Sequence, residues 1–331
     1  MGSLSSPGLQ KLAISVYLLV FPVTIILPLA CIYFGGWNAA LIYVGYLIFI
    51  NSSYGMEASR TASWTPWLRR WKLWDHFAAY FPARIIKTHD LPADKGPYLF
   101  NVAPHGVCVY SAWAAFDTDG CGFPHLFPGL DVRALTLKSN FRLPLVREFL
   151  LLHGVCDVSK KSCLSILSRG PASGIMLAAG GASESLLTQP GCYDLVLAKR
   201  KGFVRVALQT GASLVPVLFF GENDLYEVHI PQKGSSLEKL QTNMLRYLGF
   251  TIPLFWGVGF FGGRGLLPRR MPLNIVIGKP LKVGKFEGST HSEEFAQQVD
   301  SVHQQYTASL IELWDAHKNK FAADRRRSLQ K

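Results

Sequence analysis

The sequence predicts an α/β fold with a mostly parallel sheet flanked by helices, preceded by an N-terminal transmembrane helical hairpin. Residues 12–56 contain no Asp, Glu, Lys or Arg, and the stretch is long enough for two membrane segments of about 20 residues each. From residue 97 onward, short apolar runs alternate with stretches of helical periodicity. This alternation is typical of a sheet built from parallel strands.

The composition fits a protein that works at a membrane or on anionic ligands. Of the 331 residues, 49% are hydrophobic and only 17% are charged, whereas about a quarter of the residues are charged in ordinary soluble domains. The net charge of +12 favours a phosphate-bearing ligand or an acidic lipid surface. We expect no nucleic-acid partner, since zinc-finger spacing, a basic recognition helix and an RNA-binding aromatic motif are lacking. The six cysteines lack metal-ligand spacing, so we expect reduced thiols and no metal.

The uncharged stretch 12–56 predicts two hydrophobic segments, at about 12–34 and 39–55, joined by a turn at Gly35-Gly36-Trp37-Asn38. One basic residue precedes the hairpin and several follow it. Under the positive-inside rule, residues 1–11 and the chain after the hairpin then face the cytosol. A cleaved signal peptide is the alternative, but the stretch is too long and lacks a clear cleavage site.

Residues 57–96 are expected to form a tryptophan-rich interfacial helix and a linker. Thr65 and Pro66 suit the start of a helix. Six aromatic residues occur at helical spacing from there: Trp64, Trp67, Trp71, Trp74, Phe77 and Phe81. Because Trp prefers the headgroup layer, this stripe predicts a helix lying in the membrane surface. The alternative is an ordinary stripe that faces the protein core.

A globular domain is expected over 97–321, with a basic tail over 322–331. Apolar runs predict strands at 97–102, 131–137, 174–179, 213–220 and 272–278. Helical periodicity and capping residues predict helices at 107–116, 143–152, 160–169, 199–211, 236–248 and 291–318.

Two polar residues stand where predicted strands end. His105 follows the first strand in Pro104-His105-Gly106, and Glu184 follows the strand at 174–179 in a glycine-rich turn. Carboxyl ends of parallel strands meet at one edge of a sheet, so we expect the two side chains to lie close together. A histidine oriented by a carboxylate suits general-base chemistry. Taken singly, each is also compatible with a structural turn residue.

Other segments carry weaker signals. Lys199, Arg200 and Lys201 stand at the start of a predicted helix, where cations and free amides bind phosphate groups, but a solvated surface or a contact with acidic lipid is equally compatible. Cys108 would share a helix face with His105, which suggests acyl transfer through a thiol as a further hypothesis. The glycine- and aromatic-rich segment 255–263 suits an apolar wall for acyl chains or a contact with the membrane.

Many separate blocks of the sequence, in the same order, resemble the type-2 diacylglycerol acyltransferase family, which also contains monoacylglycerol and wax-alcohol acyltransferases. The resemblance runs from Tyr80 to Phe321. The matching blocks are Lys87-Thr88-His89, Pro104-His105-Gly106, Asn140-Phe141-Arg142, Gly180-Gly181-Ala182-Ser183-Glu184-Ser185, Arg200-Lys201-Gly202-Phe203, Val215-Pro216, Phe220-Gly221-Glu222-Asn223, Gly278-Lys279-Pro280 and the run from Trp314 to Phe321.

The resemblance implies a glycerolipid acyltransferase-like fold and transfer of a fatty acyl group from acyl-CoA to diacylglycerol, giving triacylglycerol. It also implies the endoplasmic reticulum membrane and the lipid droplet as locations. Acyl-CoA is then a substrate, and no cofactor is expected. His105 would act as the general base and Glu184 would orient and charge its ring, while turn amides at Gly106 or Gly181 would stabilise the oxyanion. Lys199, Arg200 and Lys201 would contact the phosphates of acyl-CoA.

Two departures from the family pattern bear on these roles. Many members carry His-Pro-His-Gly where this chain has Ala103, so the role of base falls to His105. The broader glycerolipid acyltransferases have Asp five residues after the histidine, where this chain has Tyr110. Glu184 is therefore the expected partner. The sequence leaves open a monoacylglycerol or long-chain alcohol acceptor, a catalytically silent lipid-droplet protein, and the formation of homo-oligomers.

Overall fold

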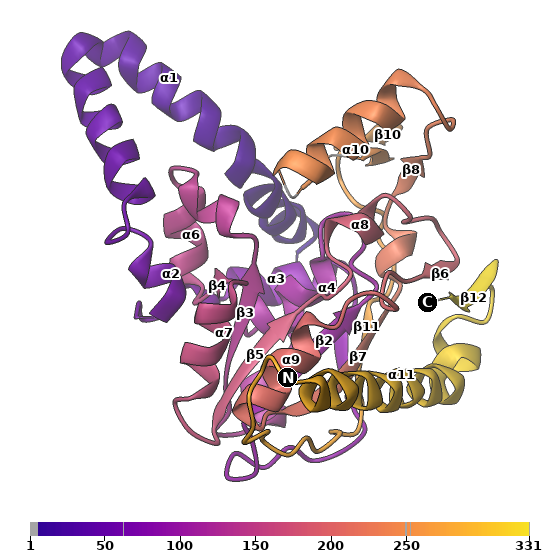
Figure 1. Ribbon diagram of the computed structural model, residues 1–331. Helices are drawn as coiled ribbons and strands as arrows, with labels where there is room; N and C mark the ends of the chain where they lie inside the picture. Colours follow the sequence, from indigo (N-terminus) through magenta and orange to yellow (C-terminus); the bar gives the residue numbers. More distant parts are fainter. Residues whose placement is uncertain (1–5, 62, 249, 252, 331) are drawn as a thin grey trace.

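The computed structural model in Figure 1 describes residues 6–61, 63–248, 250–251 and 253–330. Its centre is a seven-stranded sheet made of β1 (Arg84–Lys87), β2 (Tyr98–Ala103), β3 (Asp131–Thr136), β4 (Cys156–Asp157), β5 (Ser173–Leu177), β7 (Ser213–Phe220) and β11 (Asn274–Ile277). The strand order is β1-β11-β7-β2-β5-β3-β4. All neighbouring pairs are parallel except β7 and β11. The predicted α/β class with a mostly parallel sheet is confirmed.

All five predicted strands are present, as β2, β3, β5, β7 and β11. The sequence analysis missed β1 and β4, because four and two residues are too few for a recognisable apolar period. It also missed two small sheets. They consist of antiparallel β8 (Glu227–His229), β9 (Leu254–Val258) and β10 (Arg264–Gly265), and of the parallel pair β6 (Cys192–Asp194) and β12 (Arg327–Gln330). Part of the predicted basic tail is therefore a strand, and Lys331 lies outside the described residues.

Helices cover both faces of the sheet, because alternate residues of a strand point to opposite sides. Phe100 and Val102 of β2 share one core with α1 (Pro7–Asn51), α3 (Leu73–Tyr80), α4 (Tyr110–Ala112), η2 (Trp113–Asp117), α5 (Phe123–Leu126), η3 (Lys138–Arg142) and α6 (Val146–Leu152). Leu99 and Ala103 share the other core with α7 (Lys160–Leu167), α9 (Gly202–Thr210) and α11 (Glu293–Phe321). The helix α10 (Ser236–Leu248) has its predicted bounds.

The predicted hairpin is a pair of helical legs within α1 (Figure 1). The break falls at Gly36, inside the predicted turn, where φ of 60° and ψ of −150° leave the helical region. Only glycine adopts such angles without strain. Ser6 caps the first leg by accepting a hydrogen bond from the backbone N–H of Leu9. Within the described residues, α1 is the helix that is long and apolar enough to cross a membrane, and residues 1–5 lie outside the described residues.

The prediction of one continuous interfacial helix after Thr65 is wrong. A 3₁₀ turn, η1 (Leu68–Arg70), precedes α3, and the chain is extended at Trp71 between them. Trp74 and Phe77 are fully buried, the second against Tyr17 of α1. The spacing of aromatic residues does not reveal whether lipid or protein covers them. Here protein does, since the first leg of the hairpin packs on Phe77, and Trp113 and Phe149 pack on Trp74. Trp67 and Trp71 are 59% and 49% exposed, so they stay candidates for the membrane surface.

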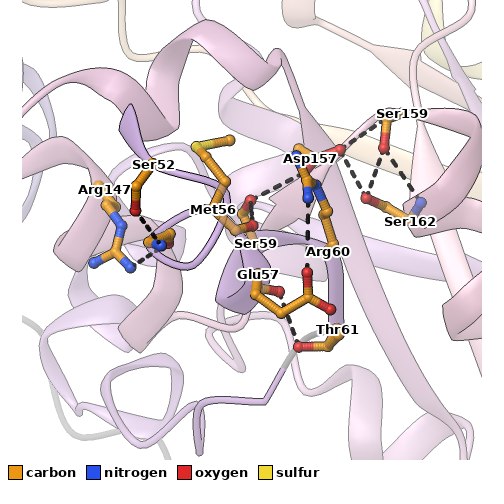
Figure 2. A network of polar contacts seen from close by, with 11 residues as sticks. Ser52, Met56, Glu57, Ser59, Arg60, Thr61, Arg147, Asp157, Ser159 and Ser162 are labelled. Atoms are coloured by element: carbon orange, nitrogen blue, oxygen red, sulfur yellow. Dashed lines mark hydrogen bonds and ion pairs between the residues drawn. The ribbon is translucent and has the colours of Figure 1, made fainter. Parts of the chain in front are cut away.

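Polar contacts attach the second leg of the hairpin, and the residues that follow it, to the globular domain. Tyr46 donates a hydrogen bond to Glu148 of α6, and the guanidinium of Arg147 donates to the carbonyl of Gly55 over 2.7 Å. Figure 2 shows the next contact, in which Ser59 of α2 (Glu57–Thr61) donates to Asp157 over 2.9 Å. These bonds fix the hairpin and the domain relative to each other.

Asp157 is the centre of this network. Its carboxylate is completely buried and accepts hydrogen bonds from the hydroxyl groups of Ser59 and Ser162 and from the N–H of Ser159. Burial opposes its ionisation, but the hydrogen bonds from Ser159, Ser162 and Ser59 outweigh this effect and hold the pKa of Asp157 below its ordinary value. The stabilisation is therefore complete above the ordinary pKa of Asp and is lost as the pH falls through the lower folded-state value.

We expect Asp157→Asn to lower the free energy of unfolding by about 2 kcal/mol, because its amide group must face at least one buried donor. Thermal or denaturant unfolding in detergent measures this change. Glu57→Gln is the matched control, since the Glu57 carboxylate is half exposed and pairs with Arg60 at 3.6 Å, and such pairs contribute about 0.5 kcal/mol. Equal effects of the two substitutions would contradict the central role of Asp157.

Candidate active site

Three adjacent strands bring polar residues to one edge of the sheet. β2 lies between β7 and β5 and is parallel to both. His105 follows β2, Glu184 follows β5 and Glu222 follows β7. Because the strands are parallel, their carboxyl ends meet at the same edge. His105 and Glu184 lie together there, as expected, and Glu222 joins them.

The ring of His105 is held in one tautomer. Its Nδ1 lies 3.0 Å from the carbonyl oxygen of Gly106. A carbonyl oxygen only accepts, so in the neutral ring Nδ1 carries the proton and Nε2 has the lone pair. Burial lowers the pKa of His105, and the Gly106 carbonyl opposes this shift only in part. The ring is therefore neutral at pH 7, with Nε2 as its basic atom.

The Glu184 carboxylate accepts hydrogen bonds from backbone N–H groups and not from the imidazole of His105. One oxygen accepts the N–H of His105 over 3.0 Å and the other accepts the N–H of Val196 over 2.9 Å. The side chain is only 3% exposed. Burial raises the pKa of Glu184, while the bonds from Val196 and His105 and the nearby Arg200 oppose the shift. The expectation that Glu184 orients and charges the ring is corrected: it fixes the turn from which the ring projects.

The glycines in the turns after β5 and β2 have different structural roles. A Cβ at Gly180 would lie 2.0 Å from Cδ of Glu184, so that carboxylate folds directly over Gly180. Gly181 has φ of +55°, and its N–H already donates to the carbonyl of Ala178 over 3.1 Å. This N–H is therefore not available to an oxyanion. Gly106 has φ of +66°, and within the described residues its N–H has no acceptor, which leaves it as the candidate oxyanion donor.

Gly180→Ala is expected to lower turnover by about tenfold to a hundredfold without unfolding the protein. The added methyl group displaces the Glu184 carboxylate and with it the backbone of His105, and small misplacements of catalytic groups cost about that much. Steady-state kinetics on the purified membrane protein measure the loss. Gly284→Ala is the control, since a Cβ there meets no atom within 4 Å. Full activity of Gly180→Ala would refute the tight packing described above.

The three predicted phosphate-binding residues do not form one cluster. Arg200 donates to the hydroxyl of Ser183 over 3.0 Å and so lies beside the Glu184 turn. Lys201 instead forms an ion pair with Asp300 of α11 at 2.7 Å. Lys199 is exposed, and the helix they were expected to begin starts at Gly202. Arg200 is therefore the predicted cation closest to the site.

The sequence analysis named Glu222 within a matching block but gave it no role. Its buried carboxylate accepts hydrogen bonds from the N–H groups of Tyr110 and Ser111, over 2.9 and 2.8 Å, and from the Ser111 hydroxyl over 2.6 Å. Burial raises the pKa of Glu222 to about 7, although the bonds from Ser111 and Tyr110 oppose the shift. The signal was present, since Glu222 follows a long apolar strand just as His105 does.

The structure argues against the cysteine hypothesis. The helix predicted at 107–116 begins only at Tyr110, because Val109 adopts a left-handed conformation with φ of 54°. Cys108 therefore lies in a loop, and burial raises the pKa of its thiol to about 12. A protonated thiol is a poor nucleophile. Instead, the Cys108 carbonyl accepts a hydrogen bond from the hydroxyl of Tyr17 over 2.6 Å, so the first leg of the hairpin contacts this loop.

Comparisons with known proteins agree with the resemblance seen in the motifs. Residues 31–330 match the family model described as diacylglycerol acyltransferase. Diacylglycerol O-acyltransferase 2A of Umbelopsis ramanniana is 43% identical over 80% of this chain and 74% of its own length. Diacylglycerol O-acyltransferase 2 of Dictyostelium discoideum is 37% identical over 95% of this chain and 93% of its own. The human protein of that name is 36% identical over 86% of this chain and 72% of its own length.

Among solved structures, a 1-acyl-sn-glycerophosphate acyltransferase from Thermotoga maritima aligns with 91% of this chain and 97% of its own, with 11% identity and a TM-score of 0.39. The assignment rests instead on the sequence matches, which extend over most of the chain and include the turns that carry His105, Glu184 and Glu222. The chain belongs to the diacylglycerol acyltransferase family.

Proposed function

We propose that this protein transfers a fatty acyl group from acyl-CoA to the free hydroxyl of diacylglycerol and so makes triacylglycerol. The observation that carries the proposal is the family match over residues 31–330, together with relatives named for this activity that are 36% to 45% identical. The neutral His105, with Nδ1 bonded to Gly106 and Nε2 as the basic atom, supplies the group that such a reaction needs.

In the proposed step, Nε2 of His105 takes the proton of the acceptor hydroxyl while the oxygen attacks the thioester carbonyl. The carbon–oxygen bond forms, and the N–H of Gly106 stabilises the negative charge on the carbonyl oxygen. The carbon–sulfur bond then breaks, and the leaving thiolate of CoA takes the proton back from the imidazolium. An ester replaces a thioester, so the step transfers no electrons to or from a cofactor. Arg200, beside the Glu184 turn, is the residue we assign to a phosphate of acyl-CoA.

We further infer that the hairpin lies in the endoplasmic reticulum membrane, with both termini and the domain in the cytosol, and that the enzyme also reaches lipid droplets. The length and apolar composition of α1 support the membrane. The turn between β9 and β10 supports a contact with the lipid surface, because Phe261 in this turn is 99% exposed. The preceding residue, Phe260, lies under the ammonium group of Lys11 of α1, so the turn is next to the hairpin. Protease treatment of sealed microsomes would cleave tags at both termini if this topology is right.

The acceptor is tested by giving labelled acyl-CoA to membranes from a host without its own acyltransferases. Diacylglycerol, monoacylglycerol and a long-chain alcohol are supplied separately, and the lipid products are resolved. We expect labelled triacylglycerol to be the main product. A dominant product from either other acceptor would reassign the substrate. If none of the acceptors gives a labelled ester, the result favours a catalytically silent lipid-droplet protein. Ala103, which replaces the first histidine of the family motif, supports that alternative.

A further inference from the structure

We propose that Glu222 is a positioning residue that fixes the loop 104–109, and thereby His105, at the edge of the sheet. This inference rests on the proposed function, in which His105 is the base. Glu222 follows β7, Glu184 follows β5, and β2, which carries the histidine, runs between them. The loop is thus held by one carboxylate from each neighbouring strand, and neither backbone contact was expected from the sequence.

Glu222 holds the far end of the loop. Its three hydrogen bonds come from the first residues of the helical segment 110–117, where backbone N–H groups lack partners within the helix. A carboxylate at this end is favoured by the helix dipole and by charge-assisted hydrogen bonds. Since β7 fixes Glu222, the bonds also fix where the loop ends and the helix begins.

The same side chain touches the near end of the loop. A Cβ at Gly106 would lie 2.5 Å from Cγ and 2.7 Å from Oε1 of Glu222, so the glycine backbone packs directly on the carboxylate. Gly106 follows His105 and bonds to its ring. One carboxylate therefore supports both the residue that sets the tautomer of the ring and the residues that close the loop.

The loop between these ends needs such support. Val109 has φ of 54°, which is rare for a β-branched residue and costs about 1–3 kcal/mol. The bonds from Tyr110 and Ser111 to Glu222 come directly after it and hold the chain in this conformation. Position 110 is also the place where the wider acyltransferases are expected to carry an acid, and here a tyrosine stands there. The carboxylate that bonds to the backbone of this position comes from Glu222.

The test is Glu222→Gln in the full-length protein in lipid vesicles. Its amide group must face the N–H of Tyr110 or Ser111, so one bond is lost while the size of the side chain is kept. We expect kcat to fall by about 10- to 100-fold, with the KM for acyl-CoA changed less than about twofold. Hydrogen exchange of the amides of residues 106–111 should become faster. Glu227→Gln, on the neighbouring β8 and bonded to Trp256, is the control and should leave the kinetics and this exchange unchanged.

The two readouts separate this inference from the proposed function. Unchanged exchange over residues 106–111, or faster exchange with an unchanged kcat per folded enzyme, would overturn the positioning role. A loss that appears only in KM would do the same. If the wild-type protein makes no triacylglycerol, the proposed function fails, and the exchange of the loop amides still decides whether Glu222 holds the loop.

Discussion

Replacing His105 by Ala is expected to lower kcat for acyl transfer by about 10² to 10⁴-fold, the usual contribution of a general base. The loss should appear in kcat rather than in the KM for acyl-CoA, because the imidazole acts on the acceptor hydroxyl in the transition state. The fold should survive, since the ring is partly exposed and its described contact is with the carbonyl of the next residue, Gly106. Initial rates with both substrates at saturation measure the effect.

The pH dependence gives an independent check on the same residue. Burial lowers the pKa of His105, so the neutral form persists below the ordinary range of histidine. Lowering the pH protonates Nε2 and removes the base, so the decline in activity that His105 causes should lie below the ordinary pKa of histidine, about 6.5. The profile is measured in Glu222→Gln, which lacks the carboxyl group that titrates at about pH 7. In this variant, a decline that begins above the ordinary pKa of histidine would contradict the lowered pKa of the ring.

His229→Ala is the matched control for His105→Ala, because His229 is an exposed residue at the end of β8. It should keep wild-type kcat and pH dependence. If His105→Ala inserted normally into membranes and kept near-wild-type turnover, another group would have to be the base. The Cys108 thiol would not fill that role, because its pKa of about 12 keeps it protonated.

The parts of the fold that a local pattern determines were predictable from the sequence. β2, β5 and β7 are buried along their whole length, and such strands read as continuous apolar runs. The break of the hairpin at Gly36 followed from glycine in an apolar stretch. The two strand ends carrying His105 and Glu184 were found for the same reason, since a polar residue after an apolar run marks the edge of a parallel sheet.

What the sequence did not reveal depends on contacts between distant segments. Nothing local shows that the first leg of α1 packs on Phe77 or that Trp113 and Phe149 pack on Trp74, so their stripe resembled a membrane surface. Likewise, whether a carboxylate meets a ring or a backbone N–H is decided by a few ångströms of loop geometry. Glu222 was overlooked because its partners, Tyr110 and Ser111, are more than a hundred residues away in the chain.

Glu184→Gln is expected to lower kcat by about 10²-fold, the second largest effect after that of His105→Ala. The two carboxylate oxygens accept the N–H groups of His105 and Val196, and an amide can accept only one of them, so its NH₂ group faces the other. An unpaired buried N–H costs about 1–3 kcal/mol, which the loop relieves by moving His105 away from the productive position. Glu312→Gln, at an exposed position of α11, is the control.

The pH profile of Glu184→Gln distinguishes a backbone anchor from a partner of the imidazole. The shift in the pKa of His105 comes from burial and from the Gly106 carbonyl, with no contribution from Glu184. Glu184→Gln should therefore reduce kcat by a similar factor at every pH and leave the acidic decline where it is in the wild type. A carboxylate that charged the ring would raise the pKa of His105, so its removal would move the decline to lower pH. Such a displacement would restore the role in which Glu184 acts on the ring itself, whereas a uniform loss places its action on the backbone of the turn.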